Sequence, residues 1–501
     1  MKKMENIKEN SKKSNMIEII MSKIPKLTIP EIIVLVLALV FYLFWASIIT
    51  LDPPATRGND EWMRFMLPDF IYRYNRLPTG FDPEVIYGRG GWSYAFYPQF
   101  LGPILSAFFM HLASLIRTGP FVLLFAARMT SVLAGITTVF FVNRTLRVLT
   151  DNKKVSLLGM IFIAFWPQFG FLSAYVNNDI IAVAGVSIMC YAVARSYRDT
   201  WTIKNSVTLA IGMAICLLSY LNSSGFVLAF GIYFLISNWI DIRKKQIEWK
   251  AFWKKFAVVF LIVALLWFPF LARNAMLYDG DFLGMRAFNQ AKTDWEQNES
   301  MNWAYENARA WSEDFGLEWH EGLVFEWVSI FTFFEYRGGY FDAGHPFEGT
   351  LIELFQYERW QQITTRSFVT NLYFAYVAYF PRWLYVIYGG FFATALLGMG
   401  LLKKLDVKQK WIVGTCVLGS VITIGLWLYY NMFIDIQPQG RYFFTITVPL
   451  VMAMAVGVNH VISRLSQKKQ IIALTLVIAS YMGLLAYVFG EFLRLRFVIY
   501  G

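Results

Sequence analysis

The sequence predicts an all-α polytopic membrane protein with about 11 transmembrane helices, and two observations predict this class. The chain has 501 residues, of which 57% are apolar and only 16% are charged, whereas a soluble domain carries about 25% charged residues. The apolar residues form repeated continuous blocks, and several approach the roughly 20 residues that a helix needs to cross a hydrocarbon core. The mean hydropathy of +0.46 agrees with this class.

The expected spans are continuous apolar segments, and the shorter ones predict tilt or extension into flanking residues. They lie at residues 31–50, 122–142, 155–175, 180–197, 205–221, 225–240, 254–273, 379–401, 411–432, 443–463 and 470–490. Residues 31–501 are therefore expected to form a single transmembrane domain behind a basic tail, residues 1–30.

Basic residues gather in that tail and in short loops between the apolar blocks, which is the positive-inside pattern. The basic loops are residues 143–154, 195–204, 241–255, 403–410 and 464–469. We expect the tail and these loops to be cytoplasmic, so an even number of crossings must separate each pair. The same pattern accounts for the net charge of +11 without a nucleic acid partner.

The apolar segment 100–116 breaks this parity if it crosses the membrane. It is short and carries Gly102 and Pro103 near its start, so we expect an interfacial or re-entrant helix on the outer side. The alternative is an ordinary crossing, which would invert the topology downstream. With the first interpretation, residues 51–121 and 274–378 form two outer loops, the second of them large.

Unusual polar residues collect at the predicted outer ends of the helices. Ionisable groups at membrane depth are costly, which favours a functional role. The alternative is a set of solvated helix ends, where side chains reach water cheaply. All of these polar residues lie on the same predicted side of the membrane, which favours function. The residues are Asp60 and Glu61 in the first outer loop, then Asp179, Arg273 and Asn274, and finally Gln439 and Arg441.

The stretch RGNDEWMR places two adjacent acids between two arginines. On a helix, Asp60 and Glu61 would point about 100° apart, so they are not expected to share one proton. Spacing of i,i+4 would pair Arg57 with Glu61 and Asp60 with Arg64. A carboxylate beside a guanidinium stays ionised at neutral pH and can act as a general base on a hydroxyl.

Arg273 and Arg441 offer guanidinium groups that suit bidentate binding of phosphate. A base and cations together at the outer interface predict transfer onto a hydroxyl from a donor with a phosphate leaving group.

Several motifs in chain order resemble the GT-C class of membrane glycosyltransferases, which includes the protein O-mannosyltransferases and the lipid A aminoarabinose transferases. The acidic pair that follows the first helix is similar to the signature of that class. The segments AFYPQFLGPILSAF, FAARMTSVLAGITTVFFVNRTLR, FLSAYVNNDIIAVAG, FPFLARNAMLYDGD and QGRYFFTITVPL look like a poorly characterised bacterial branch. The resemblance covers most of the chain.

The resemblance implies a donor sugar linked to a polyprenyl phosphate such as undecaprenyl phosphate. The implied acceptor is a hydroxyl of a cell-surface glycan or lipid-linked precursor, glycosylated with inversion on the extracytoplasmic face of a bacterial plasma membrane. Asp60 would be the base, Glu61 would orient its surroundings, and Arg273 and Arg441 would hold the lipid phosphate. Supporting places would fall to Arg57, Arg64, Asp179, Asn274 and Gln439. One departure is that FYPQF and YLNSSGF carry no lysine, where many relatives place one near the lipid phosphate.

No two histidines have the spacing of metal ligands, so no fixed metal site is expected. A divalent ion held loosely at the donor phosphate stays open. Two other function classes also stay open, namely a flippase or transporter for a lipid-linked glycan and a glycan polymerase or ligase. Transporters commonly show internal repeats and polar sites at the membrane midplane, and the sequence shows no repeat and few charges at helix centres. A purely structural membrane protein is the remaining alternative.

Overall fold

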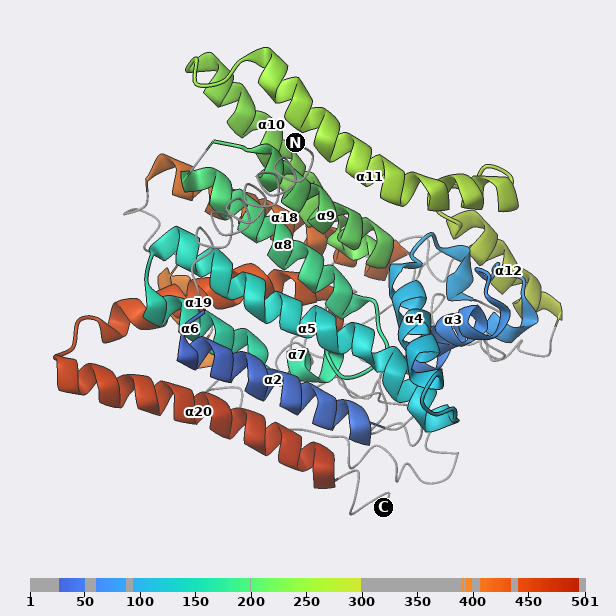
Figure 1. Ribbon diagram of the computed structural model, residues 1–501, viewed down its shortest axis with the longest axis horizontal. Helices are drawn as coiled ribbons and strands as arrows, with labels where there is room; N and C mark the ends of the chain where they lie inside the picture. The colour runs from blue at the N-terminus through green and yellow to red at the C-terminus, as the bar shows by residue number, and fades with distance from the viewer. Residues whose placement is uncertain are drawn as a thin grey trace, which may run out of the picture.

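A computed structural model gives the structure of the protein. It describes residues 27–49, 60–86, 93–198, 200–298, 389–391, 393–398, 406–433 and 440–494. Every regular element in these ranges is helical, which confirms the all-α class (Figure 1). The larger ones are α2 (Ile29–Ile48), α3 (Glu61–Tyr74), α4 (Leu101–Ser114), α5 (Pro120–Thr150), α6 (Lys153–Ala164), α7 (Pro167–Leu172), α8 (Asp179–Arg198), α9 (Ile203–Ser219), α10 (Ser224–Arg243), α11 (Trp249–Leu277), α12 (Met285–Asn298), α18 (Val407–Phe433), α19 (Thr447–Ile462) and α20 (Gln467–Arg494), with the 3₁₀ turns η2 (Pro83–Val85), η3 (Tyr94–Phe96), η4 (Leu221–Ser223) and η6 (Gly440–Ile446).

Eight of the described helices are long and apolar enough to cross a membrane, compared with the 11 spans expected. The expected span 155–175 is broken into α6 and α7, because Pro167 starts a new helix directly after Trp166 and proline cannot continue the hydrogen bonds of the preceding one. Helix α9 has 17 residues, which is short for a crossing. The expected span 379–401 lies largely outside the described residues.

Helix α8 forms the centre of the bundle and α11 its periphery. Within the most apolar stretch of 18 residues in each helix, 83% of the residues of α8 are buried, compared with only 6% of those of α11. Gly185 of α8 and Gly212 of α9 let these two helices approach each other closely. A Cβ added to Gly185 would lie only 2.9 Å from the carbonyl oxygen of Gly212, so a larger residue would not fit. Such close contacts through small residues are typical of packed membrane helices. The exposed apolar face of α11 suits contact with lipid.

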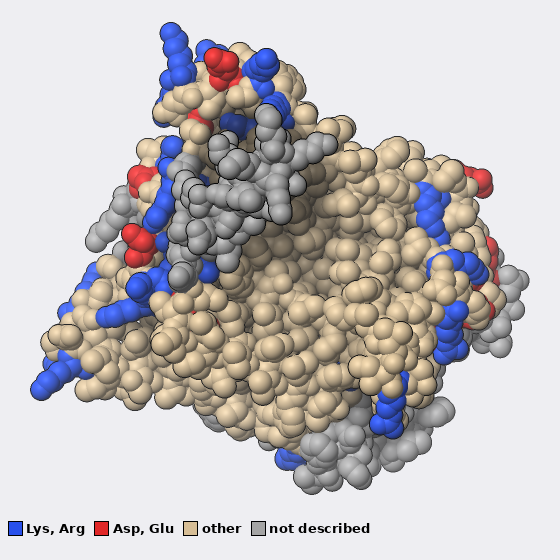
Figure 2. All heavy atoms as spheres, viewed as in Figure 1, with Lys and Arg blue, Asp and Glu red and all other residues tan. Residues whose placement is uncertain are grey.

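The basic loops lie together at one end of the bundle, as the parity argument requires. The Tyr197 hydroxyl donates to Asp406 over 2.5 Å, and the Arg198 guanidinium donates to the carbonyl of Val148 over 2.9 Å. Figure 2 shows charged side chains gathered toward opposite ends of the visible face, with a broad uncharged surface between them. These contacts bring the loops 143–154, 195–204 and 403–410 together, and the cytoplasmic location of the basic loops stays a prediction.

Segment 100–116 forms α4, which has 14 residues and is therefore about 21 Å long. A hydrocarbon core is about 30 Å thick, so α4 is too short to cross it upright. It packs on α3 and α5 at the end of the bundle opposite the basic loops (Figure 1). The Ser106 hydroxyl joins it to α5 by donating to the carbonyl of Ala127 over 3.0 Å. This placement agrees with a juxtamembrane helix.

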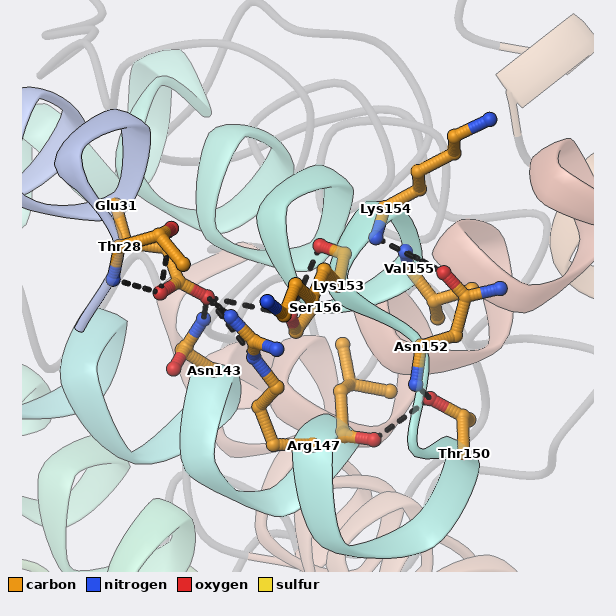
Figure 3. A network of polar contacts seen from close by, with 11 residues as sticks. Thr28, Glu31, Asn143, Arg147, Thr150, Asn152, Lys153, Lys154, Val155 and Ser156 are labelled. Carbon is orange, nitrogen blue, oxygen red and sulfur yellow. Dashed lines mark hydrogen bonds and ion pairs between the residues drawn. The ribbon is translucent and has the colours of Figure 1, made fainter. Parts of the chain in front are cut away.

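The buried carboxylate of Glu31 fastens α2 to α5 at the basic end (Figure 3). One oxygen accepts hydrogen bonds from the backbone N–H and the hydroxyl of Thr28, which caps the start of α2. The other oxygen accepts from Asn143 over 2.7 Å and from Arg147 over 2.7 and 3.0 Å. Ser156 of α6 lies 3.4 Å from that same oxygen. Because Glu31 is only 1% exposed, its charge depends on these partners.

The Glu31→Ala variant should lose about 3–5 kcal/mol of unfolding free energy, because it leaves the largely buried Arg147 without its carboxylate. Unfolding of the full chain in detergent micelles measures the loss. Asp151→Asn is the matched control, since Asp151 pairs with Arg198 at 3.7 Å on the surface and asparagine also tolerates its positive φ. The control should cost under about 1 kcal/mol. Equal losses in the two variants would contradict the role of Glu31.

Candidate functional site

Asp60 and Glu61 lie where α3 begins, and their backbone separates their side chains. Asp60 is the N-cap of α3 and has φ 56° and ψ 10°, in the left-handed region. Aspartate and asparagine adopt this region more readily than most residues with a side chain. Helix α3 then starts at Glu61. The chain therefore turns sharply between the two acids.

Glu61 points into the bundle and is fully buried. Arg128 of α5 grips it with two hydrogen bonds, 2.8 Å from Nε to Oε1 and 2.6 Å from Nη2 to Oε2. The remaining terminal nitrogen of Arg128 donates to the carbonyls of Ala46 and Ile49 at the end of α2. The backbone N–H of Val176 also donates to Glu61 Oε1, over 2.9 Å. This bidentate, charge-assisted pair ties together α2, α3, α5 and the segment before α8.

The structure pairs Glu61 with a residue that local spacing does not point to. Arg128 lies 67 residues further along the chain and binds both carboxylate oxygens. The expected i,i+4 partner, Arg57, lies outside the described residues, so its pairing with Glu61 stays a prediction.

Asp60 lies next to this buried pair in the chain and is half-buried. The Tyr94 hydroxyl donates to its Oδ2 over 3.3 Å. Arg64, predicted to accompany Asp60, places its guanidinium 4.6 Å from the centre of the same Tyr94 ring. Arg64 and Asp60 are thus joined through one tyrosine. A half-buried carboxylate of this kind is chemically able to receive a proton from a substrate hydroxyl.

Asp179 lies at the start of α8 and is 1% exposed. Neither of its carboxylate oxygens has a hydrogen-bond partner in the structure as described. The turn before it is built by Asn177, which donates to the carbonyls of Leu172 and Tyr175 and accepts from the N–H of Ile180. Buried polar groups without partners are rare and commonly mark a functional place. Because Val176 contacts Glu61, Asp179 belongs to the same region as the acidic pair.

Arg273 and Asn274 fasten the end of α11 to the first outer loop. Arg273 donates to the carbonyl of Pro78 over 2.6 Å, and its guanidinium lies 5.1 Å from the centre of the Phe100 ring. Asn274 is fully buried and donates to the carbonyl of Phe96 over 2.8 Å. Both residues therefore reach the same end of the bundle as Asp60. Part of the donor capacity of Arg273 already serves the protein itself.

The last two predicted site residues lie at the start of the chain segment that leads into α19. Arg441 belongs to the turn η6, which packs on α8, although its side chain lies outside the described residues. Gln439 is wholly outside them. The topology therefore brings η6 to the helix whose first residue is Asp179.

Other ionisable groups of the outer loop are fixed in neutral or paired states. Hydrogen bonds from Arg76 hold the pKa of Asp82 below its usual range, and Thr79 adds further donors while slight burial opposes them. Burial raises the pKa of both Tyr97 and Tyr278, so these phenols stay protonated. Asp82 is therefore already committed to a partner, and the two tyrosines are poor bases at neutral pH.

A pocket of about 1170 Å³ adjoins this region between the end of α2, one face of α3 and the start of α5. Its walls are mainly apolar, with Asp69 and Glu84 among the few charged groups and Arg128 from α5. No group of three or more His, Cys, Asp or Glu side chains converges anywhere in the described ranges. The residues present there do not build a fixed metal centre.

Residues 102–269 match a protein-family model described as dolichyl-phosphate-mannose-protein mannosyltransferase. This stretch is similar to that family of membrane glycosyltransferases. The matched stretch is 168 of the 501 residues and runs from α4 into α11. It includes Arg128 and Asp179. Comparison of the whole sequence with curated proteins gives no significant match.

Solved structures with a similar fold include the oligosaccharyltransferase of Archaeoglobus fulgidus. Its apo form has a TM-score of 0.53 at 15% identity, over 92% of this chain and 56% of that one. The same enzyme with an inhibitory peptide and a dolichol-phosphate has a TM-score of 0.50 at 14% identity, over 91% and 56%. ArnT of Cupriavidus metallidurans, bound to undecaprenyl phosphate, has a TM-score of 0.48 at 11% identity, over 91% and 64%. The chain thus spans just over half the length of the oligosaccharyltransferase, and the likeness to it concerns the fold alone.

Two residues of this candidate site are not predicted by the sequence patterns. They are Arg128, which stands within one of the family-like segments, and Tyr94. A signal for Arg128 exists, because an arginine inside the apolar block 122–142 requires a buried partner. No comparable signal marks Tyr94, since only the folded first outer loop brings its hydroxyl to Asp60.

Arg128→Gln should destabilise the protein by about 3–5 kcal/mol, because it strands the buried carboxylate of Glu61. The double variant Glu61→Gln, Arg128→Gln should be more stable than Arg128→Gln alone, since it removes the uncompensated charge. Unfolding in detergent micelles, arranged as a double-mutant cycle, measures this coupling. If the losses of the two single variants simply add in the double variant, the pair is not coupled and the assignment fails.

Proposed function

We propose that this protein transfers a sugar from a polyprenyl-phosphate donor to a hydroxyl of a cell-surface glycan or a lipid-linked precursor. The observation that carries the proposal is the half-buried Asp60, which accepts from Tyr94, next to the fully engaged Glu61. The matched family description, with its dolichyl-phosphate-linked mannose, supports a lipid-phosphate donor. The solved relative that holds a dolichol-phosphate supports the same donor class.

In this proposal Asp60 is the general base. It takes the proton of the acceptor hydroxyl as that oxygen attacks the anomeric carbon from the face opposite the phosphate. The bond between the anomeric carbon and the phosphate oxygen breaks, and the polyprenyl phosphate leaves with the bonding electron pair. One displacement at the anomeric carbon inverts its configuration.

The hydrogen bonds of the acidic pair support this division of roles. Both oxygens of Glu61 are occupied by Arg128, and one of them also accepts from Val176. All of these bonds serve the buried ion pair that holds α3 in place. Glu61 is therefore assigned the positioning role, and Asp60 the role of the base.

The donor phosphate is assigned to Arg273 and Arg441, with Asn274 and Gln439 beside them. Guanidinium groups bind phosphate oxygens strongly and would stabilise the charge that develops on the leaving group. Arg57 and Arg64 are assigned supporting places near Asp60, and Asp179 a place near the acceptor. We derive no step through a metal ion, although a divalent ion loosely held by the donor phosphate is compatible with these roles.

The proposed location is a bacterial plasma membrane, with the basic loops in the cytoplasm and the Asp60 end on the extracytoplasmic face. The sidedness follows from the positive-inside pattern and from the observed gathering of the basic loops at the opposite end of the bundle.

Asp60→Asn should lower sugar transfer by a hundredfold or more, roughly the contribution of a positioned base. Asparagine fits the left-handed backbone of position 60, so expression and membrane insertion should stay normal. Asp69→Asn, on the same helix, is the control and should retain activity, since Asp69 pairs with exposed Arg73. Composition of the surface glycan, with the wild-type gene, either variant or no gene, gives the readout. Unchanged glycosylation with Asp60→Asn would remove Asp60 from its role.

The same comparison separates the rival functions. Loss of a single side-chain sugar in the strain without the gene supports the transferase. Loss of the whole polymer supports a flippase or a polymerase instead.

Arg441→Ala should raise the donor concentration needed for half-maximal rate by about ten- to a hundredfold, because one charge-assisted hydrogen bond is lost. Transfer assays with varied polyprenyl-phosphate donor measure this shift. Lys468→Ala, at an exposed position at the start of α20, is the control. If Arg441→Ala needs the same donor concentration for half-maximal rate as the wild-type protein, Arg441 is excluded from the phosphate site.

A further inference from the structure

A furrow of about 470 Å³ runs between α10 and α18 toward the basic end of the bundle. Its walls are apolar and come from the second half of α10 and the first half of α18, including Ile232, Ile236, Trp411 and Leu418. Lys410 is the one charged residue among its described lining. The furrow lies at the opposite end from Asp60, so it is separate from the proposed reaction.

The shape of the furrow suits a single hydrocarbon chain. Its lining on α18 extends from Val407 to Leu418, which is about 16 Å along a helix. Gly414 lies within this stretch, and a Cβ added there would meet no atom within 4 Å. The glycine therefore leaves the furrow open, and its long axis follows the helices. An acyl chain in a bilayer would lie in this direction.

The charge around the basic end of the furrow favours an anionic headgroup. Lys408 and Lys410 are both exposed at the start of α18. Asp241 already interacts electrostatically with three lysines, namely Lys408, Lys255 and Lys244.

Asp406, which lies just before α18, is also engaged. It accepts hydrogen bonds from the Tyr197 hydroxyl and from the N–H of Gln409. Lys410 thus remains at the furrow as a cation for a ligand.

We propose that the furrow binds one anionic phospholipid, with an acyl chain between α10 and α18 and the headgroup phosphate at Lys410. Basic pockets between membrane helices recognise anionic headgroups, with about 1 kcal/mol gained for each lysine near the charged surface. A wall of apolar side chains with one lysine at its end matches both parts of such a lipid. The bound lipid would hold α10 and α18 together. This inference does not depend on the proposed function.

Native mass spectrometry of the full-length protein tests the proposal, with phosphatidylglycerol and phosphatidylcholine offered in detergent at equal concentration. Phosphatidylglycerol should be retained about fivefold better. Lys410→Gln should remove most of this preference. Lys468→Gln is the matched control, because Lys468 is exposed at the start of α20 and does not line the furrow. Equal retention of the two lipids by the wild-type protein would overturn the proposal.

Filling the furrow gives a second, independent readout. Gly414→Leu should abolish retention of phosphatidylglycerol by occupying the space of the acyl chain. Gly425→Leu is its control, since Gly425 lies on the same helix and also faces open space, but outside the furrow. Retention by the control and not by Gly414→Leu supports the site. Equal retention by the two variants places the lipid elsewhere and overturns the proposal. The same holds if Lys410→Gln prefers phosphatidylglycerol as strongly as the wild-type protein does.

Discussion

The outer end of the protein depends on the buried ion pair between Arg128 and Glu61. Neither charge could remain in this interior alone, because an unpaired buried charge costs several kcal/mol. Arg128 also donates to two carbonyls at the end of α2, whose last turn leaves its carbonyl groups without helical partners. One guanidinium therefore satisfies a carboxylate and a helix end together. The position of α3, and with it Asp60, follows from this arrangement.

Helix α5 is fastened to α2 at both of its ends. Arg128 binds the end of α2 near the proposed site, and Arg147 binds Glu31 near the start of α2 at the basic end. Two polar attachments so far apart prevent the helices from sliding or rotating against each other, which apolar packing in lipid would allow more easily. The acidic pair thus stands on a rigid pair of helices, and such support is what precise catalytic geometry requires.

Much of the fold could be predicted from local patterns. Apolar blocks located the main helices, and the charges of the loops showed which helix ends lie together. The divergence of Asp60 and Glu61 could be foreseen, but the partner of Glu61 could not. The i,i+4 rule looks only within one helix, whereas Arg128 arrives from another helix through tertiary packing. The break before Pro167 was missed because hydrophobicity continues across it. The role of Tyr94 depends on the folded path of the first outer loop, which no spacing rule describes.

The left-handed backbone of Asp60 restricts which amino acids this position can hold. Only glycine, asparagine and aspartate adopt such a conformation at low cost. Of these three, aspartate alone carries a group that can accept a proton at neutral pH. Glutamate offers the same chemistry but fits the backbone poorly, and asparagine offers the same shape without the chemistry. Under the proposed role of Asp60, active members of a lineage should keep aspartate here, and a change to asparagine or glycine would mark a copy that keeps the fold without the base.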